Sequence, residues 1–185
     1  MSEKLPDRFD SVEALEEFMT RPSAALVAEL AKTAGDIIVL GVGGKMGPTL
    51  ARMAKRAAPA KRVIGVARFS EKGVREALET AGVEPIAADL LDRAALERLP
   101  KATNVVFMAG HKFGAAGSPS FTWAMNVAVP WMVAEHYRDC RIVAFSTACV
   151  YPFARTDGPG ANESEPAIPP RGDYANSCVG RERMF

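Results

Sequence analysis

Apolar positions along the chain follow two alternating spacings, which predict strands and helices in turn. Short continuous apolar runs, typical of strands buried on both faces, occupy residues 37–40, 62–67, 84–88, 104–108 and 141–145. Helical spacing occupies residues 48–54, 73–80, 94–99 and 121–137, and begins again near Tyr174. Strands that alternate with helices predict an α/β fold, a doubly wound parallel sheet (Rossmann fold) with five recognisable strands and right-handed crossovers.

Two stretches interrupt this order. Pro130 lies inside the helix at 121–137 and is expected to bend it or mark a local break, because proline lacks the backbone N–H that a helix interior needs. Residues 152–172 collect prolines, glycines and polar residues and are predicted to form a loop.

Two helical segments, 11–20 and 23–33, precede the first strand, and Ser11 and Ser23 are candidates for their N-caps. We therefore expect a helical leader at 1–34 and one domain at 35–185. A packing arm or a dimer contact is the simplest role for the leader. The helix from Tyr174 is cut at Phe185, so the domain is expected to be incomplete at its C-terminal end.

Composition narrows the class of protein. The chain has 185 residues, a formal net charge of +1, 48% apolar and 24% charged residues, which is typical of a soluble globular protein. A strongly basic balance, expected of a nucleic-acid binder, is missing from the sequence, and so is a run of about 18 apolar residues long enough for a membrane span. Three widely spaced cysteines indicate a reducing compartment, the cytoplasm. Neither histidine has metal-ligand spacing, so no metal site is predicted.

A glycine-rich turn joins the first strand to the next helix. It contains Gly41, Gly43, Gly44, Lys45, Met46 and Gly47. Glycine at such a turn permits an unusual φ, close approach of the backbone to a pyrophosphate, and close packing of helix on strand, while the helix N-terminus offers N–H donors to phosphate. A GxxxxGK[ST] phosphate loop does not fit, because Val39 stands where its first glycine must be. The turn predicts a dinucleotide site; the alternative is a purely structural turn.

The end of the second strand bears on the choice of dinucleotide. A carboxylate about 20 positions after the glycines would hold the ribose 2′-hydroxyl of NAD. Here the sequence has Arg68 and no carboxylate, and a guanidinium suits a 2′-phosphate. NADP is therefore favoured over NAD, with charge added by Lys45. The alternative for Arg68 is a solvated surface charge.

From Asp36 to Phe185 the chain resembles the extended short-chain dehydrogenase/reductase family, in its NAD-dependent epimerase/dehydratase group. The resemblance is carried by Gly41-x-x-Gly44-x-x-Gly47, Asp89-Leu90, Ala109-Gly110, Asn126, Ser146-Thr147 and Tyr174. It implies that Asp89 contacts the adenine, that Leu90, Ala109 and Gly110 belong to the cofactor site, and that Asn126, also in the cofactor set, has a structural and relay role. It also implies that Tyr174 is the general acid/base and that Thr147 or Ser146 orients the substrate oxygen.

The chain departs from this family at Cys178, which stands where the Tyr-x-x-x-Lys motif has its lysine. A free tyrosine has a pKa of about 10, and a neutral thiol does not lower it as an ammonium would. Cys178 is interpreted as a small residue on the helix face. The alternative is that Cys178 acts as a nucleophile, but the sequence shows no base partner that would activate its thiol. Lys112, after Gly110, is a candidate for supplying the missing charge.

The expected function is an NAD(P)-dependent oxidoreductase of epimerase or dehydratase type that acts on a hydroxyl or carbonyl of a sugar-like or other small polar substrate. The substrate class rests on the resemblance alone. The alternative is an NADP-binding sensor or regulatory protein that has lost the chemistry together with the lysine. The resemblance also implies a homodimer that pairs through the helices at 121–137 and from Tyr174.

Overall fold

The computed structural model describes residues 5–112 and 114–185. Its five strands form one sheet in the order β3-β2-β1-β4-β5, and every neighbouring pair is parallel. The strands are β1 (Ile37–Leu40), β2 (Val63–Ala67), β3 (Glu84–Ala87), β4 (Asn104–Phe107) and β5 (Arg141–Ala144). The predicted α/β fold is confirmed as a Rossmann fold, and the chain switches direction across the sheet between β1 and β4.

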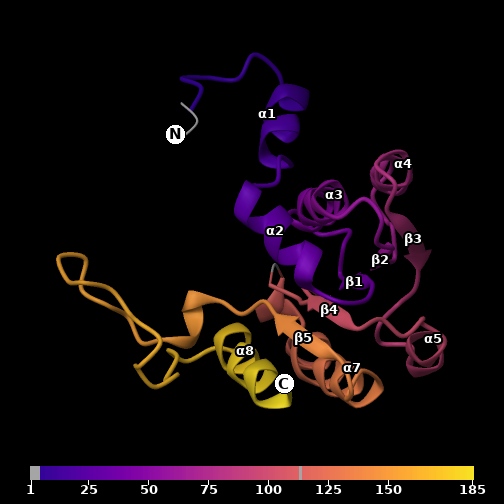
Figure 1. Ribbon diagram of the computed structural model, residues 1–185. Helices are drawn as coiled ribbons and strands as arrows, with labels where there is room; N and C mark the ends of the chain where they lie inside the picture. The colour runs from indigo at the N-terminus through magenta and orange to yellow at the C-terminus, as the bar shows by residue number, and fades with distance from the viewer. Residues whose placement is uncertain (1–4, 113) are drawn as a thin grey trace.

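Helices cover both faces of the sheet (Figure 1). One face carries α2 (Ala24–Lys32), α3 (Gly47–Ala57) and α4 (Val74–Thr80), and the other carries α5 (Arg93–Glu97), α7 (Val129–His136) and α8 (Asp173–Met184). Alternate residues of β1 enter the two cores, with Ile37 and Val39 on the α3 side and Ile38 and Leu40 on the α7 side. Both faces of the central strand are therefore buried.

The leader packs on α3. Ser11 and Ser23 cap α1 (Val12–Met19) and α2, as predicted, each accepting a hydrogen bond from a backbone N–H at 3.1 Å. Arg56 of α3 donates to the fully buried hydroxyl of Thr20 at 2.8 Å and pairs with Glu17 at the same distance. These contacts hold the leader against the C-terminal end of α3, away from the glycine turn.

The helical run at 119–136 changes its hydrogen bonding just before Pro130. It consists of α6 (Pro119–Trp123), a π-helical segment η2 (Ala124–Ala128) and α7. The N–H of Val129 bonds to the carbonyl of Ala124, five residues back, so the wider turn directly precedes the proline. The predicted interruption is thus a π-helical segment, and Asn126 within it is fully buried.

The segment 152–172 contains no helix or strand, as predicted, and extends away from the sheet as the orange loop of Figure 1. A short 3-10 turn, η3 (Ala148–Val150), connects β5 to it. Within residues 5–112 and 114–185, no helix has both the length and the apolar character needed to cross a membrane.

Candidate functional site

The glycine turn lies at the carboxyl end of β1, and two of its glycines are required by packing. Gly41 has φ +91°, and a Cβ there would lie 2.6 Å from the backbone nitrogen of Ala109. A Cβ on Gly47 would lie 2.2 Å from the carbonyl oxygen of Val42. At Gly44 the nearest atom would be 3.5 Å away, so the backbone there has room for a ligand. Glycine at each position therefore serves the turn, the packing or the approach of a ligand.

The N-terminus of α3 points into the same turn. Met46 precedes the helix and makes no side-chain capping hydrogen bond. The first N–H groups of a helix have no partner within the helix, and they lie at the positive end of its dipole. The turn and the helix end therefore fit a pyrophosphate, as the sequence predicts.

A cleft opens on one side of the turn, across the ends of β1, β2 and β4, with about 930 Å³ of empty space that is partly open to solvent. Of the predicted residues, it is lined by Gly41, Gly43, Gly44, Arg68, Asp89, Leu90, Ala109 and Gly110. The Asp89 carboxylate accepts the N–H of Leu91 at 3.0 Å, which fixes its position. Arg68 is exposed, and the next residue, Phe69, has φ +51°, a conformation uncommon outside glycine. The backbone is thus tightly bent where Arg68 meets the cleft.

A second cleft, of about 710 Å³, continues from the first on the α8 side. The two share Gly41, Gly44, Met108, Ala109 and Gly110. The second adds Lys45, Met46, Gly47, His111, Lys112, Phe145, Ser146, Tyr174 and Arg181. The structure therefore places the predicted cofactor residues other than Asn126, together with Ser146 and Tyr174, along one continuous surface at the β1–β4 switch point, whereas Asn126 and Thr147 line neither cleft.

Tyr174 lies half-buried at the first turn of α8. Burial raises the pKa of its phenol, a hydrogen bond with the Thr147 side chain lowers it, and the neighbouring Cys178 raises it again. The net direction is upward, so the phenol holds its proton at neutral pH. Ser146 is hydrogen-bonded to Glu182, which lies on α8.

Cys178 is fully buried one turn after Tyr174. Burial raises the pKa of its thiol, and the positive charge of Arg181 opposes this only in part, so the thiol is neutral. Lys112 is exposed, and its Nζ lies 5.6 Å from the centroid of the Tyr174 ring. It is therefore close to the tyrosine, as the hypothesis about this lysine requires.

Asn126 joins the loop after β4 to α8. Its Nδ2 donates to the carbonyl of His111 at 3.0 Å and to the Ser177 hydroxyl at 2.9 Å. Its Oδ1 accepts from the backbone N–H of His111 at 2.8 Å and from Arg181 at 2.7 Å. Every hydrogen-bonding position of the buried amide is used, so Asn126 lies beneath the cleft and fixes its walls.

Arg181 is the residue of this site that sequence reasoning missed. It lies three residues after Cys178, on the same side of the helix as Tyr174, and is only 7% exposed. The signal available in the sequence is the spacing 174, 178, 181, which repeats with the helical period. A charged residue at that spacing is ordinarily interpreted as solvated, and only the packing of α8 against η2 shows that this one is buried.

The parallel sheet and the glycine turn define the class of the protein as a Rossmann-fold domain. Residues 37–184 match the profile of the NAD dependent epimerase/dehydratase family, and the chain belongs to that family. A comparison with curated proteins gives no match. No group of three or more His, Cys, Asp or Glu side chains suited to a metal ion occurs in the described part of the chain.

Solved structures share the fold. The enzyme WbmG of Bordetella bronchiseptica, in complex with NAD and UDP, is 23% identical, with TM-score 0.66 over 82% of this chain and 49% of that one. A UDP-Glc/GlcNAc 4-epimerase of Campylobacter jejuni is 21% identical, with TM-score 0.68 over 82% and 48%. DesIV, a dTDP-glucose 4,6-dehydratase of Streptomyces venezuelae with NAD and TYD bound, is 23% identical, with TM-score 0.68 over 80% and 50%. The chain thus spans about half the length of these structures.

Proposed function

We propose that the chain forms the dinucleotide-binding part of an NADP-dependent oxidoreductase of epimerase or dehydratase type, acting on a hydroxyl or carbonyl of a sugar-like or other small polar substrate. The observation that carries the proposal is the continuous surface that has the glycine turn at its centre and Ser146 and Tyr174 at one end. Similar folds that bind NAD together with UDP or TYD support the substrate class.

The residues fit a dinucleotide that lies across the switch point. Gly41, Gly44 and Gly47 with the start of α3 would hold the pyrophosphate, and Asp89 and Leu90 would contact the adenine. When bound, the nicotinamide supplies or accepts the hydride. In the reducing direction the protonated Tyr174 would give its proton to the substrate oxygen. In the oxidising direction the phenol would first have to lose its proton, and the phenolate would then accept the proton of the substrate hydroxyl. Thr147 positions the phenol, and Ser146 hydrogen-bonds the substrate oxygen.

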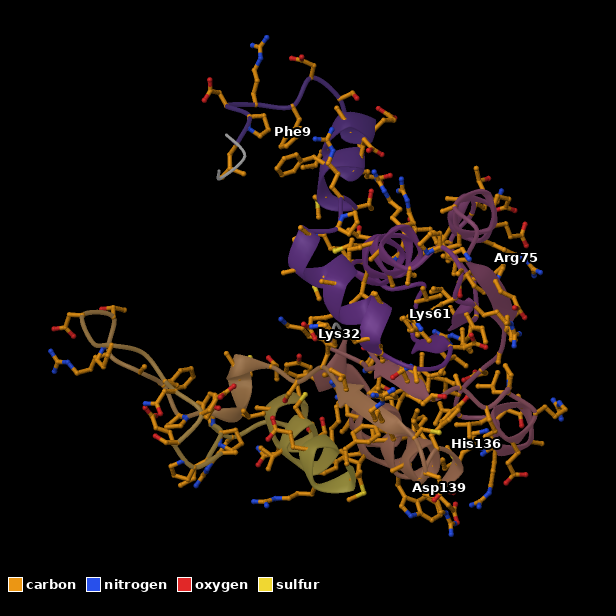
Figure 2. All side chains as sticks on the ribbon, viewed as in Figure 1. Phe9, Lys32, Lys61, Arg75, His136 and Asp139 are labelled. Carbon is orange, nitrogen blue, oxygen red and sulfur yellow. The ribbon has the colours of Figure 1, made fainter. Side chains whose placement is uncertain are left out.

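The preference for NADP rests on Arg68, which is exposed on the rim of the cleft. Arg68→Met is expected to weaken NADPH binding about tenfold and to leave NADH binding unchanged, because only NADPH carries a phosphate for the guanidinium. Arg75→Met is the control, since Arg75 belongs to α4 and lies at the periphery of the molecule (Figure 2). Equal NADPH affinities in the wild type, Arg68→Met and Arg75→Met would assign Arg68 to the solvated surface.

Hydride transfer in the full-length protein tests the function. The assay follows NADPH absorbance with simple carbonyl compounds and, for nucleotide sugars, conversion of the substrate by chromatography, because an epimerase or dehydratase returns its hydride and leaves the absorbance unchanged. Tyr174→Phe serves as the inactive variant. Turnover that Tyr174→Phe lowers by a factor of 100 or more, the usual range for a general acid, supports the enzyme. Binding of NADPH without turnover, and with no effect of Tyr174→Phe, would favour the sensor.

We also propose that the protein is a cytoplasmic homodimer that pairs through α6, α7 and α8. Trp123 and Trp131 on these helices are 40% and 49% exposed, which is unusual for side chains of this size. Free Cys140, Cys149 and Cys178 fit a reducing compartment. Sedimentation of the wild type against Trp131→Glu tests the pairing, and a monomeric wild type would contradict it.

A further inference from the structure

Arg181 is held in the wall of the second cleft by three uncharged neighbours. Its Nη1 donates to the carbonyl of Phe145 at 3.0 Å, and its Nη2 donates to Oδ1 of Asn126 at 2.7 Å. The guanidinium carbon lies 5.9 Å from the centroid of the Phe107 ring. The side chain thus connects the end of β5, the π-helical segment and β4, yet none of these contacts neutralises its charge.

The described residues supply no paired counter-ion for this guanidinium. Within the described residues no carboxylate comes within 4.0 Å of it, and its Nε is buried without a hydrogen-bond partner. Cys178 does not compensate either, because its raised pKa keeps the thiol neutral. An unpaired buried charge is costly, and a neutral amide would suffice to bond two carbonyl oxygens. The positive charge itself therefore points to a ligand.

The guanidinium faces the catalytic end of the surface. Arg181 lines the second cleft together with Tyr174, Ser146 and Gly110. A Cβ on Gly110 would lie 2.4 Å from its Nη2, so the absence of a side chain at Gly110 makes room for it. Lys45 and Lys112 line the same cleft from exposed positions, where water screens their charges more strongly than that of a buried group.

We propose that Arg181 supplies the fixed positive charge at the nicotinamide end of the cleft, in place of the lysine that position 178 lacks. This inference rests on the proposed function, because hydride transfer beside Tyr174 puts the nicotinamide in the second cleft. The oxidised ring is a cation and the reduced ring is neutral. A buried cation nearby therefore opposes the oxidised form and shifts the binding preference toward the reduced form.

The test is the ratio of the dissociation constants of NADP⁺ and NADPH, measured by titration calorimetry on the full-length protein. Arg181→Met is expected to lower this ratio roughly tenfold relative to the wild type, because the cation that opposes NADP⁺ is gone. Arg181→Lys and the control Arg183→Met, at an exposed position of the same helix, are expected to keep it. The double variant Cys178→Lys, Arg181→Met is expected to restore it by returning a cation to the cleft.

The outcomes separate charge from structure. A lower melting temperature with equal weakening of both nucleotides by Arg181→Met would make Arg181 a structural residue and overturn the inference. Arg181→Gln keeps donors and loses the charge, so it replaces the Met variant if that protein does not fold; an unchanged ratio in Arg181→Gln also overturns the inference. A wild type that binds neither nucleotide overturns the proposed function along with it, whereas binding with an unchanged ratio overturns this inference alone.

Discussion

Replacement of Gly110 by alanine tests how tightly the wall of the second cleft is built. The added Cβ would lie 2.4 Å from Nη2 of Arg181 and 3.0 Å from Oδ1 of Asn126. These two atoms form the 2.7 Å hydrogen bond between α8 and the π-helical segment. Arg181 is the long, movable partner, so we expect the guanidinium to be displaced and this bond to break.

The magnitude follows from that bond. A hydrogen bond to a charged group contributes about 1.5–3 kcal/mol, and a displaced guanidinium also has to find new partners in a buried region. Asn126 keeps its bond from the N–H of His111, so the amide is not left without a donor. We therefore expect Gly110→Ala to lower the free energy of unfolding by roughly 2–3 kcal/mol.

Urea unfolding of four proteins measures this effect as a cycle: wild type, Gly110→Ala, Arg181→Met and the double variant. Methionine removes the atom that the new Cβ would meet, so the double variant is expected to be more stable than the sum of the single changes by about 1–2 kcal/mol. Gly117→Ala is the control, because nothing lies within 4 Å of a Cβ there. Additive effects in the cycle would refute the close approach of Gly110 and Arg181.

Three further predictions concern the turn and the tyrosines. Gly47→Ala, whose Cβ would lie 2.2 Å from the backbone oxygen of Val42, is expected to cost at least about 2 kcal/mol in urea unfolding; a change below 0.5 kcal/mol would contradict the close packing. Burial raises the pKa of Tyr137, whose hydroxyl donates to the carbonyl of Pro100. The contribution of this protonated tyrosine to the free energy of unfolding is therefore fully present below the usual tyrosine pKa of about 10 and is lost as pH rises above it. Tyr137→Phe should remove this alkaline loss in unfolding curves, and an unchanged slope would count against it. Because the pKa of Tyr174 is also raised, kcat for reduction is expected to stay constant through neutral pH and to fall only in the alkaline range, and a fall near pH 7 would contradict the protonated phenol.

The strands and the glycine turn could be predicted from local sequence because their signals are local. A strand buried on both faces must be apolar throughout, and Ile37 to Leu40 are all buried as that pattern requires. The serine caps are equally local, since Ser11 and Ser23 bond to N–H groups three residues away. Each of these features is decided within one turn or one strand.

Long-range contacts explain what the sequence could not show. Pro130 indicates that the helix is interrupted, but the π-helical segment that turns Asn126 inward also depends on partners at Ser177 and Arg181, more than 50 residues later. The burial of Arg181 depends on Gly110 leaving space in a different loop. A charge at helical spacing gives no sign of such burial, because the same residue on an unpacked helix would be solvated.

Cys178 and Arg181 are best understood together. A lysine at position 178, with Arg181 in place, would put two cations within one turn on the buried side of α8, and the charge of Glu182, which acts on position 178, is the nearby carboxylate that would oppose them. Like charges within one turn repel in a region of low dielectric, so Arg181 disfavours a second cation at position 178. A small neutral thiol at 178 removes that conflict, and the absence of a side chain at Gly110 gives the guanidinium its place. Under the proposal above, the positive charge that position 178 lacks is held by Arg181, less than one turn further along α8.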